Sequence, residues 1–213
     1  TPEPEEHLSS FVENDLPVVA ISNVPGKNIH VIEFDDRWIG YLATKHLIDN
    51  GHRRIYHIAG PQSFPSARDR QVAFIQCMVE HDVPFNANSI IKTEGLLHDV
   101  SRAMPRLLRG RLKKTPCAFF CYSDFVAVAA YKTIREAGLR IPEDVSIIGC
   151  DDIEVACAMS PPLTTVALPT QEMGACAGRL ILQALNGELP HSHLRETFQP
   201  KLIERESVAN LKK

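Results

Sequence analysis

Polar side chains follow three of the apolar strands that the sequence predicts. A segment with two arginines follows residues 54–59, a Tyr-Ser-Asp sequence follows residues 117–121, and an acidic pair follows residues 145–149. Ligands of parallel α/β sheets bind outside the carboxyl ends of the strands. Arginine offers forked donors, whereas hydroxyls and carboxylates offer acceptors. If the three strands are neighbours, we expect a site for a polyhydroxylated ligand such as a sugar, or for a small anion-bearing metabolite.

Each of these side chains also has a simpler structural role open to it. Arg68 and Arg70 could lie in the solvated first turn of a helix, as most arginines are exposed. Asp151 or Asp152 could cap the helix that follows, because aspartate is a preferred N-cap residue. Position alone does not choose between capping and ligand binding, and one aspartate of the pair could do each.

The sequence lacks the motifs of common catalytic and metal sites. It contains no G-x-S-x-G, no P-loop, no H-E-x-x-H and no dinucleotide-binding fingerprint after a strand. His191 and His193 form a short H-x-H, and Cys117 and Cys121 are poorly spaced for a metal. We therefore expect no enzyme activity, no metal and no cofactor.

The composition is that of an ordinary globular protein of 213 residues with a net charge of −3. No basic cluster indicates a nucleic-acid surface. No apolar stretch approaches the roughly 20 residues of a membrane span, and the acidic start has no signal-peptide core. The six cysteines form no C-x-x-C and mostly lie in apolar segments, which favours reduced thiols and a cytoplasmic protein.

Strand and helix patterns alternate along the chain from residue 16 to residue 148. This alternation predicts an α/β architecture with parallel sheets. Helices are expected over residues 36–50 and 66–81, and in the second of these Val72, Ile75 and Val79 are expected to face the core.

Five motifs, in this order and spacing, resemble the effector-binding domain of LacI/GalR-type bacterial transcriptional regulators. The resemblance covers nearly the whole chain. The motifs are Gly40–Pro61, Ser66–Phe74, Ile134–Asp152, Ser160–Pro169 and Lys201–Ser207.

The resemblance implies a type I periplasmic-binding-protein-like fold of two parallel-sheet α/β lobes joined by crossing strands. The expected lobes are residues 1–35 with 170–193, which form an incomplete N-terminal lobe, and residues 36–169 with 194–213. It also implies a small effector, most often a sugar, bound between the lobes, and a homodimer whose effector changes its affinity for operator DNA. DNA would be bound only through a headpiece that this sequence lacks, and no membrane is involved.

The same resemblance assigns ligand contacts residue by residue. Arg70 resembles the second arginine of the A-R-x-R segment, and Asp151 the aspartate that accepts sugar hydroxyls. Three positions depart from the family pattern, because Ser22 stands for an acid, Ser123 for an asparagine, and Leu96 (or Leu97) for a stacking aromatic. These departures imply an atypical ligand. The other predicted contacts are Phe34 as a wall, and Trp38 and Tyr122 as aromatics that could compensate.

A sugar-binding protein of a transport system shares this fold and is the alternative function. The segments H-R-R-I, P-E-D-V-S and S-P-P-L-T-T-V, together with the unpaired cysteines, favour the regulator. The sequence names neither the effector nor the operator.

Overall fold

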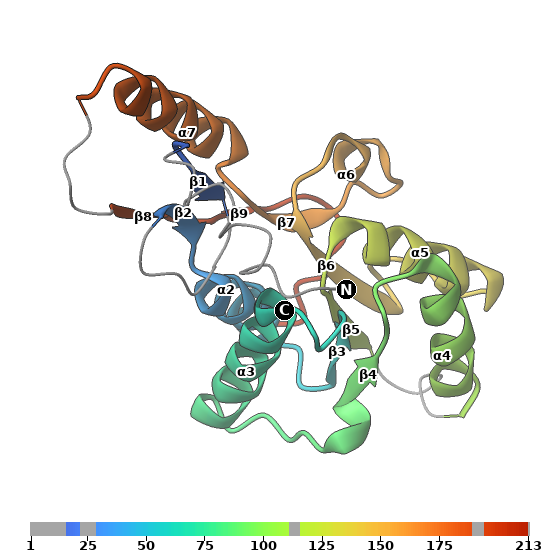
Figure 1. Ribbon diagram of the computed structural model, residues 1–213. Coiled ribbons are helices and arrows are strands. Elements are labelled where there is room, and N and C mark those ends of the chain that lie inside the picture. Colours follow the sequence, from blue (N-terminus) through green and yellow to red (C-terminus); the bar gives the residue numbers. More distant parts are fainter. Residues whose placement is uncertain (1–15, 22–28, 111–115, 189–193, 213) are drawn as a thin grey trace. The chain divides into compact units, whose positions relative to one another are not determined.

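The computed structural model describes residues 16–21, 29–110, 116–188 and 194–212. The chain forms two compact units, each built from two separate segments (Figure 1). The first unit contains Thr1–Asp35 and Pro169–Gln199, and the second contains Asp36–Leu168 and Pro200–Lys213.

The second unit is built around a six-stranded sheet with the order β4-β3-β5-β6-β7-β9. Neighbouring strands are parallel except β9, which runs antiparallel to β7. Every residue of β5 is buried, as expected for a strand covered on both faces. The predicted parallel α/β architecture is therefore confirmed. The strands are β3 Ile55–Ala59, β4 Ile90–Lys92, β5 Cys117–Cys121, β6 Val145–Asp151, β7 Thr164–Ala167 and β9 Lys201–Ile203.

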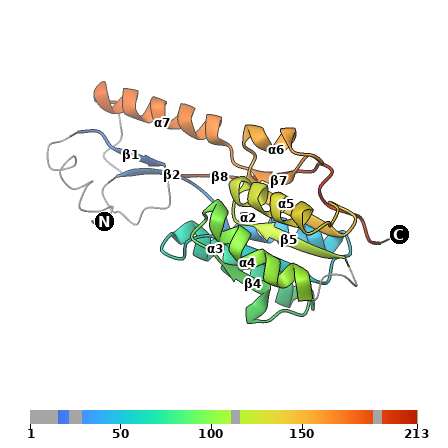
Figure 2. The same ribbon diagram turned by 90° about the vertical axis from the view of Figure 1, so that its right-hand side faces the viewer.

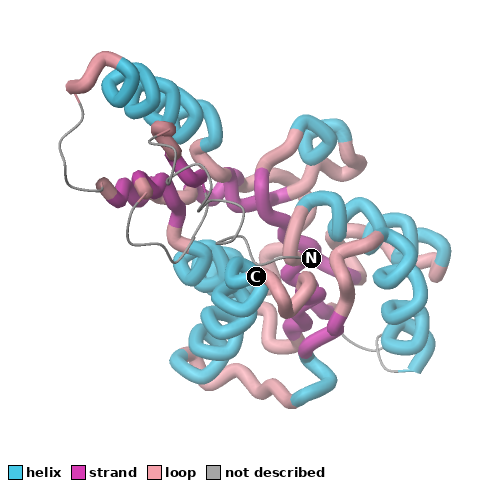
Figure 3. The backbone as a smooth tube through the Cα atoms, in the orientation of Figure 1, coloured by secondary structure: helices cyan, strands magenta, loops and turns pink. Residues whose placement is uncertain are grey.

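Helices cover both faces of this sheet (Figure 2). The pair α2 and α3 packs together on one face, and the pair α4 and α5 packs together on the other. The tube in Figure 3 shows the helix–strand alternation that the sequence predicted. The helices of the unit are α2 Asp36–Asp49, α3 Pro65–Glu80, η1 Ala87–Ser89, α4 Leu97–Gly110, α5 Asp124–Glu136 and α6 Glu154–Ala158.

The first unit contains a three-stranded parallel sheet with the order β1-β2-β8. Its strands are β1 Val19–Ile21, β2 His30–Phe34 and β8 Arg195–Phe198, and its helix is α7 Thr170–Leu185. Met173, Cys176 and Leu180 of α7 pack on Ile32 of β2. We expected residues 194–199 in the other lobe, and this boundary is wrong because β8 pairs with β2.

The orientation of α3 also differs from the prediction. Val72 and Val79 were expected in the core, but they are 43% and 60% exposed. The face toward the sheet carries Ala67, Arg70, Ala73, Phe74, Cys77 and Met78. Val72 and Val79 recur at helical spacing, but Phe74 and Met78 on the other side of the helix are fully buried, and Gly40 of α2 allows the close approach at Arg70 and Ala73.

The segment after β9 completes the second unit. Ser207 is fully buried, and its hydroxyl donates to the carbonyl of Ile147 in β6. The same hydroxyl accepts from the N–H of Thr164 at 2.8 Å, and the Ser207 carbonyl accepts from the N–H of Ile147. One serine therefore joins the beginning of β7 to the middle of β6.

His57 of β3 is buried without charge in the core. Its ring stacks on Phe74 and Phe120, and its Nδ1 lies 3.1 Å from the carbonyl of Phe120. Its Nε2 has no hydrogen-bond partner among the described residues. Burial disfavours the charged imidazolium and lowers the pKa of His57 to about 4.

We predict that His57→Phe makes the protein less sensitive to acid. The unfolded chain binds a proton at His57 below its ordinary pKa of 6.5, whereas the folded chain does so only near 4. Stability is therefore lost as the pH falls through this window, by at most about 3 kcal/mol from this group. Urea unfolding between pH 4 and 7 measures the slope. His98, whose side chain is 65% exposed, supplies the control His98→Phe. An unchanged slope in His57→Phe contradicts the assignment.

Candidate ligand-binding site

Arg70 is the centre of the polar cluster at the carboxyl ends of the strands. Its Nε donates to Oδ1 of Asp36 at 2.8 Å, and its Nη1 donates to the carbonyl of Tyr122 at 2.7 Å. The Arg70 side chain is only 4% exposed. Burial alone would lower its pKa, but the nearby acidic groups, including Asp36 and Asp151, hold the pKa above the ordinary value. Arg70 is therefore a charged residue inside the protein. The simpler role considered for both arginines, a place in a solvated helix turn, applies only to Arg68, which is exposed.

Asp151 ends β6 next to this arginine. Its Oδ1 lies 3.8 Å from Nη1 of Arg70 and accepts from the thiol of Cys150. Burial raises the pKa of Asp151, and Arg70 opposes that shift. The side chain keeps 26% of its surface exposed, so its oxygens remain accessible as acceptors for a ligand.

Tyr122 adds an aromatic ring and a hydroxyl to the cluster. The guanidinium carbon of Arg70 lies 4.9 Å from the ring centroid, within cation–π range. The phenol oxygen lies 3.2 Å from Oγ of Ser66. Gly60 makes room for the ring, since a Cβ at Gly60 would lie 2.5 Å from it. The predicted contacts Arg70, Asp151 and Tyr122 thus lie together.

Ser123 and Asp152 have hydrogen-bond partners within the protein. The hydroxyl of Ser123 accepts from the N–H of Val126 at 3.3 Å and so caps α5. Asp152, one of the two aspartates that could cap the next helix, instead pairs with Nη2 of Arg205 at 2.7 Å. Neither aspartate caps α6, and a different carboxylate receives the N–H of Ile153.

That carboxylate belongs to Asp124, whose importance the sequence reasoning missed. It is fully buried, and it accepts from the hydroxyl of Thr165 at 2.7 Å and from the N–H of Ile153 at 3.0 Å. Gly149 allows this approach, because a Cβ there would lie 2.1 Å from Oδ1 of Asp124. Burial raises the pKa of Asp124 to about 6, although the two hydrogen bonds act to lower it. The available signal was an aspartate three residues after one buried strand, together with a glycine near the end of the next buried strand.

The other predicted contacts lie as follows. Trp38 is on α2, 40% exposed, with its ring stacked on Tyr41 at 5.7 Å. Leu96 is 52% exposed in the loop before α4. Phe34, in the first unit, packs against the core that contains Ile32. Ser22 lies outside the described residues.

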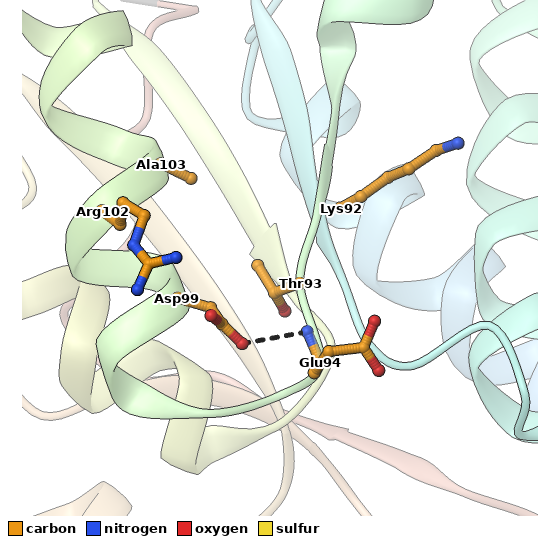
Figure 4. Close-up of a pocket in the computed structure, with 6 residues that line it drawn as sticks. All are labelled: Lys92, Thr93, Glu94, Asp99, Arg102 and Ala103. Atoms are coloured by element: carbon orange, nitrogen blue, oxygen red, sulfur yellow. Dashed lines mark hydrogen bonds between the residues drawn. The ribbon is translucent and has the colours of Figure 1, made fainter.

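A separate hollow of about 470 Å³ lies between β4 and α4. Asp99 and Arg102 come from α4, and Thr93 and Glu94 come from the loop after β4 (Figure 4). The N–H of Glu94 donates to Asp99, and the ammonium of Lys92 points away from the others. This hollow contains none of the Arg70, Asp151 and Tyr122 cluster.

The described residues contain no group of three or more histidines, cysteines or acids placed to hold a metal ion. The H-x-H at residues 191–193 lies outside them. No helix within the described ranges is both long and apolar enough to span a bilayer.

Comparison with known proteins identifies the family. Residues 44–208 match the model of the periplasmic binding protein-like domain. The chain belongs to this family. A PurR-type transcriptional repressor of Aliivibrio fischeri is 38% identical over 173 residues, which are 80% of this chain and 50% of that protein. The ribose operon repressor of Haemophilus influenzae is 38% identical over 178 residues, 81% of this chain and 51% of that protein.

A solved structure of the regulator CelR in complex with cellobiose is 29% identical, with a TM-score of 0.83, over 97% of this chain and 63% of that one. The resemblance to LacI-type regulators is thereby confirmed. The relatives are named transcriptional repressors, which agrees with a non-enzyme and favours the regulator over the transport protein. The chain spans about half the length of the curated relatives it matches.

We predict that Asp124→Asn alters the pH dependence of stability in the opposite sense to His57→Phe. The folded pKa of about 6 exceeds the ordinary 3.8, so folding binds a proton between these pH values. The resulting stabilisation is present below pH 4 and is lost as the pH rises through 6, by at most about 3 kcal/mol. Without it, the free energy of unfolding should rise more steeply with pH over this range. Hydrogen bonds from Arg140 lower the pKa of Asp144. The variant Asp144→Asn therefore serves as the control. An unaltered slope in Asp124→Asn is the contrary result.

We predict that Gly40→Ala displaces Arg70. A Cβ at Gly40 of α2 would lie 2.4 Å from the Arg70 carbonyl oxygen and 2.9 Å from its Cα. The overlap should destabilise the protein by about 1–3 kcal/mol, although alanine favours a helix. The control is Gly174→Ala in α7, where the new Cβ has no described neighbour within 4 Å. Chemical unfolding compares the two, and equal stabilities would show that this contact does not fix α3.

Proposed function

We propose that this chain is the effector-binding core of a LacI-type transcriptional repressor that binds a small metabolite, most plausibly a sugar. The observation that carries the proposal is the Arg70, Asp151 and Tyr122 cluster at the carboxyl ends of β3, β5 and β6. Open α/β sheets bind ligands at this edge. The relatives named for ribose and cellobiose support a sugar as the ligand class.

The hydrogen-bonding groups of the cluster fit a hydroxylated ligand. Arg70 uses Nε and Nη1 within the protein, which leaves Nη2 without a partner among the described residues. Asp151 supplies accessible acceptor oxygens beside it. A donor next to acceptors is suited to adjacent sugar hydroxyls, which both donate and accept. The Tyr122 ring adds an apolar surface of the kind that ligand pockets use.

We further propose that the protein acts in the cytoplasm as a homodimer and controls operator DNA through a headpiece outside this sequence. The effector then acts by binding two states of the regulator with different affinity. An exposed apolar surface supports self-association. Phe125 of α5 is 60% exposed and Val155 of α6 is 38% exposed, and the Asp124–Ile153 hydrogen bond joins the starts of the two segments.

The ligand assignment predicts that Asp151→Asn and Arg70→Ala each weaken effector binding. Losing a charge-assisted hydrogen bond should raise the dissociation constant about 10- to 100-fold. Thermal shift with sugars, nucleosides and related metabolites finds the ligand, and titration calorimetry then compares the variants.

The matched control is Arg68→Ala, two residues away on the same helix. Arg68 hydrogen-bonds only to the carbonyls of Gln62 and Ser63 among its described contacts, so its loss should leave affinity unchanged. If a hit binds Asp151→Asn and Arg70→Ala as tightly as the wild type, the site lies elsewhere. Circular dichroism shows whether each variant is folded.

A further inference from the structure

Helix α3 presents an apolar stripe to solvent. Phe64 precedes the helix and is 54% exposed, while Val72 and Val79 are 43% and 60% exposed. Ile75, which lies between the two valines, is half-buried. Val72, Ile75 and Val79 recur at i, i+3 and i+7, the spacing of the contact seam between two paired helices. We name Val72, Ile75 and Val79 the α3 stripe.

The charges at the ends of α3 are the reverse of those a helix prefers. Acidic residues stabilise the first turn of a helix and basic residues the last. In α3, the first turn contains Arg68 and no acid, and the last turn contains no base. Asp82 follows the last turn and is exposed. The acid nearest the first turn, Asp69, is engaged by Arg37 of α2.

We propose that the α3 stripe packs against the same stripe of a second copy of this chain, with the two helices antiparallel. A two-fold axis at Ile75 places Val72 of one copy within one residue of the level of Val79 of the other. Arg68 and Asp82 each lie seven residues from Ile75, on opposite sides. The same axis therefore brings Arg68 of each copy to Asp82 of the other, and each reversed helix end receives the opposite charge.

Self-complementarity selects a second copy over another partner. A two-fold contact requires that one patch carry both halves of each interaction. The α3 stripe and its flanking residues meet this requirement, because Arg68 precedes the three apolar residues and Asp82 follows them. The helix of 16 residues is about 24 Å long, so the contact is smaller than a standard protein interface and the association is weak.

The contact does not depend on the proposed ligand or on DNA, and it uses a different surface from the α5 and α6 surface proposed for the homodimer. Two such surfaces on each chain would allow assemblies larger than a dimer. The two contacts can therefore be tested separately on the same protein.

Sedimentation equilibrium of the 213-residue chain over a range of concentrations tests the proposal. The double variant Val72→Lys with Val79→Lys should raise the dissociation constant of one association step about tenfold or more, because it places charges in the seam. The matched variant Phe125→Lys, at a side chain as exposed as Val79, should leave that step intact. Equal association of the wild type and the double variant overturns the α3 contact. A loss confined to Phe125→Lys locates self-association on α5 and α6 alone and also overturns it.

Charge exchange tests the antiparallel arrangement. Arg68→Glu and Asp82→Lys should each weaken the step, and the double exchange should restore it, because the charges then meet again in reverse. All these side chains are on the surface, and circular dichroism verifies folding. Weakening by both single exchanges without restoration by the pair overturns the antiparallel self-contact and indicates a different partner for the stripe.

Discussion

The buried ion pair between Arg70 and Asp36 is the interaction on which the rest of the site depends. A charge inside a protein is tolerated only when it is paired and hydrogen-bonded, so the two residues fix each other. Asp36 is the first residue of the second unit, and the strand before it, β2, belongs to the first unit. Nη1 of Arg70 donates to the Tyr122 carbonyl and lies 3.8 Å from Oδ1 of Asp151. One guanidinium thereby connects the start of the second unit to the ends of β5 and β6.

Close backbone approaches allow this arrangement. Gly40 lets α2 contact the main chain of α3 at Arg70, Gly60 admits the Tyr122 ring, and Gly149 admits the Asp124 carboxylate. At Gly60 and Gly149 the absent side chain leaves room for an aromatic or polar group near the strand ends, and at Gly40 it leaves room for the main chain of α3. The geometry of the site therefore depends on the positions of these glycines as much as on the charged residues.

The sequence predicted the parallel α/β fold because apolar runs and helical periods report burial directly. It also predicted that Arg70, Tyr122 and Asp151 share one edge, since parallel strand ends do so in any such sheet. It did not predict the side of α3 that is buried, because apolar residues occur on both sides of this helix and helical spacing alone favoured Val72 and Val79 over Phe74 and Met78. It missed the exchange of partners in which Asp124 receives the N–H of Ile153 while Asp152 takes Arg205. Such choices depend on three-dimensional neighbours far apart in the sequence.

The discontinuous second unit has a consequence for its synthesis. Strand β7 lies between β6 and β9, and Ser207 joins β6 to the residue that begins β7. A ribosome releases residues 36–168 before the α7 and β8 segments, which belong to the other unit. Until residues 200–207 emerge, β7 has an unpaired edge, and unpaired edges of nascent chains are prone to aggregate. The unit that holds the site should therefore be finished last, and it should be the part that most needs protection during translation.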